Sequence, residues 1–182
     1  FENNLSGDDF INLYNSTFRI ENSNFNYSLS DAVDSDFSKG DIINSSFTNI
    51  GNDALDFSGS SLVVKNCNFK YVQDKALSAG ENSKIYFSEN LIETSELGLV
   101  VKDGSFIEAQ NNIFRENKVD LAVFFKKDFY SSPILKIDSI NNDVSYLFQR
   151  GVNIISSNKI RLNYTNNVES LLYGNYYGKS SR

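Results

Sequence analysis

The stretch Leu62-Val63-Val64-Lys65-Asn66-Cys67-Asn68-Phe69 indicates the fold, because the chain repeats its pattern. Two earlier copies are Phe18-Arg19-Ile20-Glu21-Asn22-Ser23-Asn24-Phe25 and Asp41-Ile42-Ile43-Asn44-Ser45-Ser46-Phe47, so the final phenylalanines lie 22 residues apart. Later positions continue this column at nearly the same spacing, and its members are Phe25, Phe47, Phe69, Ile92 and Phe114. A regular period of this length is typical of a solenoid.

Other columns follow the same step. An apolar column comprises Ile20, Ile42, Val64, Phe87 and Ala109, and a polar one comprises Asn22, Asn44, Asn66, Glu89 and Asn111. Two further columns comprise Val33, Leu55, Leu77, Leu99 and Val123, and Ser35, Phe57, Ala79, Val101 and Phe125, each with a final step of 24 residues. Within each repeat, apolar and polar residues alternate over short runs, which predicts strands rather than helices.

A unit of 22 residues with two or three short strands predicts one coil of a parallel β-helix. Successive coils of such a fold lie about 4.8 Å apart, so the residues of one column stack along the axis. Stacked phenylalanines would fill the interior, and asparagine suits the bends because it tolerates a left-handed backbone. The leucine-rich repeat has a similar length, but its leucine consensus and helical segment are absent.

The sequence resembles the right-handed parallel β-helix proteins of the pectate-lyase-like superfamily. Two stretches, Asn52-Asp53-Ala54-Leu55-Asp56-Phe57-Ser58-Gly59-Ser60 and Lys65-Asn66-Cys67-Asn68-Phe69, are similar to β-helix modules of large secreted bacterial proteins, some of which follow a spore-coat-kinase-like domain. We therefore expect an all-β, right-handed, single-stranded solenoid of about seven or eight coils. One domain would span residues 1–182, with regular coils over about 7–127.

The remaining residues, 128–182, would form less regular coils and a C-terminal cap. Solenoids need caps, because an exposed strand edge recruits other chains. We expect Tyr173, Tyr176 and Tyr177 to close the open end of the coil stack, in preference to forming a platform on which sugars stack.

The composition narrows the function. The net charge of −6 and the lack of basic runs argue against binding to nucleic acids or anionic membranes. His is absent and Cys67 is the only cysteine, so a disulfide framework or a Cys-rich zinc site is excluded, and we interpret Cys67 as a simple unpaired thiol. No stretch is long and apolar enough to span a bilayer, and the first residues do not form a signal peptide. Because Met is absent, we expect a piece of a larger protein with flanking domains.

One face of the predicted coils carries most of the candidate functional residues. If the column from Val33 to Val123 points inward, its neighbours point outward. The first outward column comprises Asn12, Asp34, Asp56, Ser78, Val100 and Phe124, and the second comprises Tyr14, Asp36, Ser58, Gly80, Lys102 and Lys126. From these columns we select as candidate ligand-binding residues Tyr14, Asp34, Asp36, Asp56, Lys102, Phe124 and Lys126.

Asp34, Asp36 and Asp56, here called the acidic strip, allow several interpretations. Clustered carboxylates could act as the acid and base of a glycoside hydrolase, because mutual repulsion raises the pKa of one of them. A polysaccharide lyase would need a base, for which Lys102 is the nearest candidate. The strip could instead bind Ca²⁺, the only cofactor that the sequence suggests. Equally, a solvent-facing sheet must be polar, and surface aspartates then need no further role.

A second acidic column comprises Asp9, Asp31 and Asp53 and is followed by Lys75. Asp31 and Asp53 lie two residues before Val33 and Leu55, so this column should face the same way as the inward one, at the start of the strand. We therefore expect these carboxylates to accept hydrogen bonds from turn amides, and Lys75 to neutralise Asp53.

The sequence favours a noncatalytic module, extracellular or on the cell surface, that acts as a spacer or binds polysaccharide along a rigid face. One alternative is a polysaccharide-degrading hydrolase or lyase that uses Asp34, Asp36, Asp56 and Lys102. Another is a stalk subunit of a trimeric or fibrous assembly.

Overall fold

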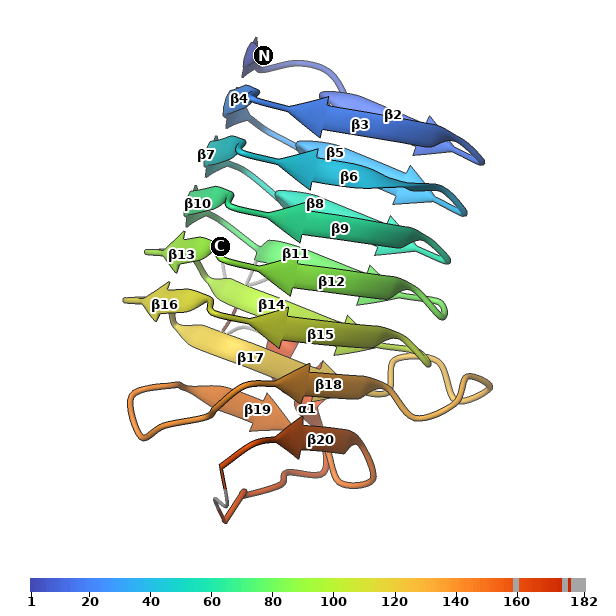
Figure 1. Ribbon diagram of the computed structural model, residues 1–182, viewed down its shortest axis with the longest axis vertical. Coiled ribbons are helices and arrows are strands. Elements are labelled where there is room, and N and C mark those ends of the chain that lie inside the picture. Colours follow the sequence, from blue (N-terminus) through green and yellow to red (C-terminus); the bar gives the residue numbers. More distant parts are fainter. Residues whose placement is uncertain (159–160, 175–176, 178–182) are drawn as a thin grey trace.

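Three parallel sheets form the walls of a β-solenoid in the computed structural model, which describes residues 1–158, 161–174 and 177 (Figure 1). Sheet A comprises β1 (Glu2–Asn4), β4 (Asn24–Ser28), β7 (Ser46–Ile50), β10 (Asn68–Val72), β13 (Leu91–Glu93) and β16 (Ile113–Arg115). Sheet B comprises β2 (Ile11–Tyr14), β5 (Val33–Asp36), β8 (Leu55–Ser58), β11 (Lys75–Gly80), β14 (Leu97–Lys102), β17 (Val119–Phe124) and β19 (Tyr146–Phe148). Sheet C comprises β3 (Thr17–Glu21), β6 (Lys39–Ile43), β9 (Ser61–Lys65), β12 (Lys84–Ser88), β15 (Phe106–Gln110), β18 (Ile134–Ile137) and β20 (Asn153–Ser156).

The coils from β2 to β16 each contribute one strand to each sheet, the last two contribute strands to sheets B and C alone, and neighbours within a sheet come from successive coils. Sheets B and C have seven strands each, so the prediction of an all-β parallel solenoid is confirmed. The described residues contain one short helix, α1 (Val168–Leu172), and none that is long and apolar enough to cross a membrane.

The phenylalanine column lies in the interior. Phe47 pairs with Phe25 on one side and Phe69 on the other, with ring centroids 4.9 and 5.0 Å apart. All three side chains are fully buried. The column continues in register through Ile92 and Phe114. Because each ring lies against the next, the interior is packed without any contribution from helices.

Left-handed residues make the bend between sheets C and A. Asn22, Asn44, Asn66, Glu89 and Asn111 all have φ between 51° and 59°. Asparagine adopts this conformation more readily than most residues do, which explains its recurrence at this position. One side-chain hydrogen bond links two members, from Asn66 Nδ2 to Asn44 Oδ1 at 2.7 Å.

Cys67 belongs to a buried polar column just after this bend. Its backbone amide donates to Asn90 Oδ1 at 2.8 Å, and its thiol donates to the Lys65 carbonyl. Two coils earlier, the Ser23 amide donates to Ser45 Oγ in the same manner. Burial raises the pKa of the Cys67 thiol to about 11, so this cysteine serves the turn and is not a reactive thiolate.

The register of the sixth coil differs from the sequence prediction. Leu99 pairs with Leu121 rather than with Val123, and Val101 pairs with Val123 rather than with Phe125. The step of 22 residues is therefore retained through β17, and the extra residues lie in the loop that follows it. As a consequence, Phe124 lies beside Lys102, and Lys126 lies beyond the end of β17.

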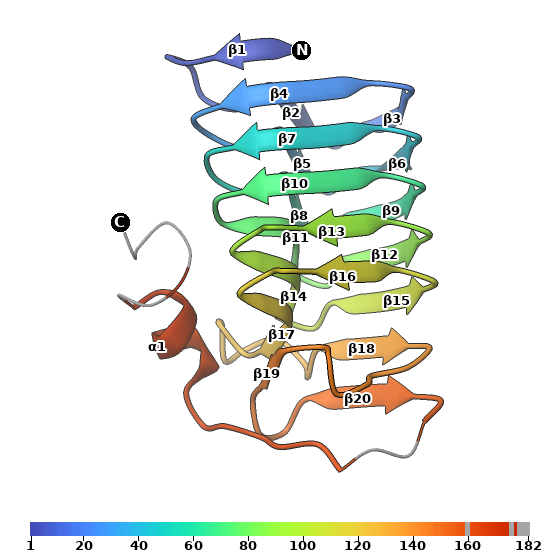
Figure 2. The ribbon, with the colours of Figure 1, turned by 90° about the vertical axis from the view of Figure 1, so that its left-hand side faces the viewer.

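Helix α1 packs on the outer face of sheet B and not across the end of the stack (Figure 2). Val168 and Leu172 form with this face a second apolar cluster, separate from the interior, that includes Leu97, Val100, Val119, Ala122 and Phe124. The prediction that Tyr173 and Tyr177 close the end is wrong, because Tyr177 packs against this cluster and Tyr173 directly follows α1. Tyr176 lies outside the described residues.

Candidate functional site

The acidic strip lies on the outer face of sheet B. Asp34 of β5 and Asp56 of β8 are direct partners on neighbouring strands, and Asp36 pairs with Ser58. Asn12 Nδ2 donates to Asp34 Oδ2 at 3.0 Å. All three aspartates are partly buried, so their charges are not fully hydrated.

This crowding changes the acidity of the strip. Burial, followed by the negative charges of Asp56 and Asp36, raises the pKa of Asp34 to about 7. The pKa of Asp36 is also raised, first by burial and then by Asp56. At neutral pH a fraction of the Asp34 side chains is therefore protonated. The strip can then both donate and accept hydrogen bonds.

The structure does not support the calcium site. Among the described residues, no three or more His, Cys, Asp or Glu side chains are grouped so that they could hold a metal ion. Asp34 and Asp36 are separated along one strand, so the trio does not converge on one point. Ca²⁺ needs six or more oxygen ligands.

The second acidic column lies at the entrance to sheet B. The amide of Asp31 donates to Asp9 Oδ1, that of Asp53 to Asp31 Oδ1 at 2.8 Å, and that of Lys75 to Asp53 Oδ1 at 3.0 Å. Each carboxylate thus binds the amide of the next coil. Lys75 Nζ lies 3.1 Å from Asp53 Oδ1 and 2.8 Å from Asp74 Oδ2, which neutralises the buried end of the column.

A pocket of about 320 Å³, here called the boundary pocket, lies between the acidic strip and α1. It is lined by Asn52, Asp53, Asp56, Asp74, Lys75, Lys102, Lys126 and Tyr173. These residues come from β8, β11 and β14, from the turns that precede β8 and β11, from the loop after β17 and from the residue that follows α1. Tyr173 thus closes one side of a pocket whose other walls are formed by sheet B and the turns around it.

Among the three lysines of this pocket, Lys102 is the one with neither a described ion-pair partner nor a described cation–π contact. The residue is 9% exposed, and no described hydrogen-bond or ion-pair partner contacts its ammonium group. Its aliphatic stem lies over Gly80, where an added Cβ would come within 3.0 Å of Lys102 Cε. Burial, the largest single influence, lowers the pKa of Lys102, but Asp56, Tyr173 and Asp53 together outweigh it and the net shift is upward. Lys102 therefore stays charged and faces the pocket.

The other two lysines of the pocket have partners. Burial opposes the charge of Lys75, but Asp53 and Asp74 outweigh it and raise the pKa of Lys75 above its usual value. The Lys126 ammonium lies 4.8 Å from the centre of the Tyr173 ring, and that of Lys75 lies 5.6 Å from the same ring. The Tyr173 ring thus contacts both ammonium groups at the rim of the pocket through cation–π interactions.

The structure also places the other predicted ligand residues. Phe124 is fully buried under α1, and the centres of its ring and the Tyr173 ring are 6.3 Å apart. Its assignment to a ligand-binding surface is therefore wrong. Tyr14 is exposed at the far end of the acidic strip. The sequence analysis missed Asp74 and Phe37. Asp74 lies 22 residues after Asn52 and so repeats a polar column, which was a usable signal.

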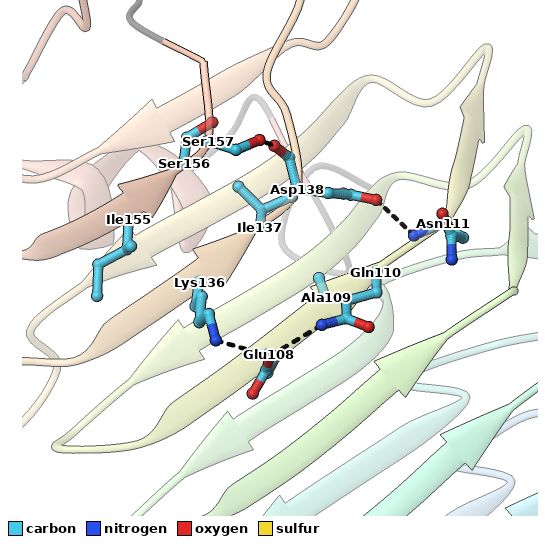
Figure 3. Close-up of a pocket in the computed structure, with 10 residues that line it drawn as sticks. All are labelled: Glu108, Ala109, Gln110, Asn111, Lys136, Ile137, Asp138, Ile155, Ser156 and Ser157. Atoms are coloured by element: carbon cyan, nitrogen blue, oxygen red, sulfur yellow. Dashed lines mark hydrogen bonds and ion pairs between the residues drawn. The ribbon is translucent and has the colours of Figure 1, made fainter.

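A second pocket, of about 330 Å³, lies on the outer side of sheet C between β15, β18 and β20 (Figure 3). Its charged groups are paired with one another. Lys136 Nζ lies 2.8 Å from Glu108 Oε1, Gln110 Nε2 donates to the same oxygen at 2.9 Å, and Asp138 Oδ2 accepts from the Asn111 amide. This pocket leaves no comparable charge for a ligand.

Comparison with known proteins agrees with the geometry. The family model described as "Right handed beta helix region" matches residues 1–170. No significant match was found among curated proteins or among solved structures. Since the family model covers nearly the whole chain and the three sheets show its coiled architecture, the chain belongs to the right-handed β-helix family.

Proposed function

We propose that this β-helix is a noncatalytic module that binds saccharide hydroxyl groups in the boundary pocket. The observation that carries the proposal is that Asp56 and Lys102 both line the pocket, while neither side chain has a described hydrogen-bond or ion-pair partner. Their charges interact, but the two side chains do not form an ion pair with each other.

A hydroxyl group is suited to such a pair. It accepts a hydrogen bond from the ammonium group and donates one to the carboxylate, so one ligand group satisfies both charges. A hydrogen bond to an ionised group is stronger than one between neutral groups, which favours a ligand that reaches both charges. A polyol with several adjacent hydroxyls would also meet Asn52 on the same wall.

The test is a glycan array of neutral and acidic oligosaccharides. We expect the wild-type chain to bind a subset of them, and Lys102→Met and Asp56→Asn each to lower the array signal by about tenfold, since a hydrogen bond to a charged group contributes about 1.5–3 kcal/mol. Methionine retains the apolar stem over Gly80, so the fold is preserved. The matched control is Lys84→Met, on the exposed face of β12, which should leave binding unchanged. Absence of binding to every glycan, or unchanged binding by Lys102→Met, would contradict the proposal.

A hydrolase is the second candidate, supported by the raised pKa of Asp34, about 7, beside Asp56. Neighbouring strands lie about 4.8 Å apart, which is close to the separation of about 5 Å between the carboxyl groups of retaining glycosidases. Release of reducing ends from any glycan bound on the array would favour this candidate. Binding without release would favour the noncatalytic module.

A further inference from the structure

The exposed aromatic pair Tyr14 and Phe37 lies on the same face of sheet B as the boundary pocket. The two side chains are 68% and 54% exposed, and their ring centroids are 5.9 Å apart at an interplanar angle of 87°. They form an open corner at the N-terminal end of the acidic strip. Large exposed apolar side chains that gather at one place often mark a binding site.

The backbone at Phe37 is left-handed, as it is at two other exposed aromatic residues, Tyr27 and Tyr71. The φ of Phe37 is 52°, and the equivalent bend positions in the other coils are Asn15, Gly59, Glu81 and Asp103. Asparagine, aspartate and glycine are the residues that tolerate this conformation best. The bend itself therefore does not favour a phenylalanine at this position.

The next coil makes room for the ring. A Cβ added to Gly59 would come within 2.5 Å of Phe37 Cδ1, so the ring lies directly against this glycine. One face of the ring is thus supported by backbone, while half of the side chain remains in water. The support fixes the ring without burying it.

We propose that the corner between Tyr14 and Phe37 holds a sugar ring of an oligosaccharide, with one aromatic ring stacked on the sugar face and the other against its edge, while the other end of the oligosaccharide occupies the boundary pocket. The carboxylates of Asp34 and Asp36 lie between these two positions and would accept hydrogen bonds from the intervening hydroxyls. An apolar ring face beside carboxylates complements a sugar, which has an apolar C–H face and a polar hydroxyl edge. The inference rests on the proposed function, and it names the ligand as an extended oligosaccharide.

The length of the face supports an extended ligand. Tyr14 is on β2 and Lys102 is on β14, four coil steps further along sheet B. At about 4.8 Å per step, the two ends lie roughly 19 Å apart, which several sugar units are needed to span.

The experiment uses homologous gluco-, xylo-, manno- and galacturono-oligosaccharides, from disaccharide to hexasaccharide, on one array. We expect wild-type binding to rise at least tenfold with length in the series that is recognised. Tyr14→Ala and Phe37→Asn should reduce the hexasaccharide signal to that of the disaccharide. Tyr86→Ala, which removes from sheet C a tyrosine about as exposed as Phe37, is the matched control and should have no effect.

Stability measurements separate a binding role from a structural one. Phe37→Asn places a better residue in a left-handed bend, so its melting temperature should equal or exceed that of the wild-type chain. A lower melting temperature with unchanged hexasaccharide binding would show that the ring serves the fold, and it would overturn the inference. Equal binding of short and long oligosaccharides, sensitive to Lys102→Met, would overturn the inference while leaving the proposed function intact. No binding at all would contradict both.

Discussion

The outer face of sheet B has two halves that differ in polarity and in what covers them. In the N-terminal half, β5 and β8 alternate buried residues with partly exposed ones, among them the acidic strip. In the C-terminal half, β14 and β17 are buried at every position, because Val100, Ala122 and Phe124 lie under α1. The same strand position therefore carries a carboxylate in one half and an apolar side chain in the other.

This difference shows how one solenoid wall acquires a pocket. An unbroken face would offer only a flat ladder of side chains. Where the apolar half ends, α1 and Tyr173 stand above the sheet, and Lys75 and Lys102 lie at their border with the carboxylates. The boundary between the halves, not either half alone, creates the candidate site.

The largest expected effect is the loss of the buried cation at this boundary. Lys75→Met leaves Asp53 and Asp74 without their ammonium partner, so we expect the free energy of unfolding to fall by roughly 3–5 kcal/mol. Urea denaturation measures it. The double variant Lys75→Met with Asp53→Asn should recover a large part of the loss, since it also removes the unpaired carboxylate. If the double variant is as unstable as the single one, charge pairing is not what holds the boundary together.

A second substitution gives the half covered by α1 the polarity of the open half. Val100→Asp places a carboxylate under α1, and we expect a loss of about 2–3 kcal/mol. Undocking of α1 limits the cost, because the aspartate then reaches water. Hydrogen exchange should accordingly become fast in residues 168–172.

The reciprocal change, Asp34→Val, is the control in the open half. It relieves repulsion with Asp56 and exposes only one small apolar side chain, so stability should be unchanged or higher. Equal losses in both halves would show that cover by α1 does not distinguish them.

The interior could be predicted from the sequence, because its cause is periodic. Phe25, Phe47 and Phe69 are equally spaced, and each coil places its residues directly above those of the next. The covered half also left a signal. In Leu97-Gly98-Leu99-Val100-Val101 the alternation gives way to a continuous apolar run, which is typical of a strand buried on both faces.

The boundary pocket could not be predicted in the same way. The predicted column did place Lys126 next to Lys102, but for the wrong reason: Lys102 pairs with Phe124, and Lys126 reaches the pocket from the loop after β17. Tyr173 arrives from a helix that is distant in sequence, and its position depends on how α1 docks. Phe37 belongs to a column, but that column indicates a bend and gives no reason for an aromatic ring.

A smaller effect is expected at the rim of the pocket. Tyr173→Ala removes the ring beneath the Lys126 ammonium and its edge contact with Phe124, so we expect a loss of about 1 kcal/mol. Tyr173→Phe retains the ring and should restore the stability, as thermal denaturation would show. A loss of the same size in Tyr173→Phe would mean that the hydroxyl group, and not the ring, stabilises the rim.

The smallest expected effect concerns the pH dependence of the open half. The pKa of Asp34 is raised in the folded chain from about 3.8 to about 7, so the folded state favours the protonated form. This contribution to stability is fully present below about pH 4 and is lost as the pH rises through 7. Asp34→Asn cannot ionise, so the variant should be more stable than the wild-type chain at pH 8, by on the order of 1 kcal/mol because solvent screens the partly exposed group. The two chains should converge near pH 4, when urea denaturation is measured across this range. A difference that persists at pH 4 would arise from the lost contact with Asn12, and the crowding of the acidic strip would then not be its cause.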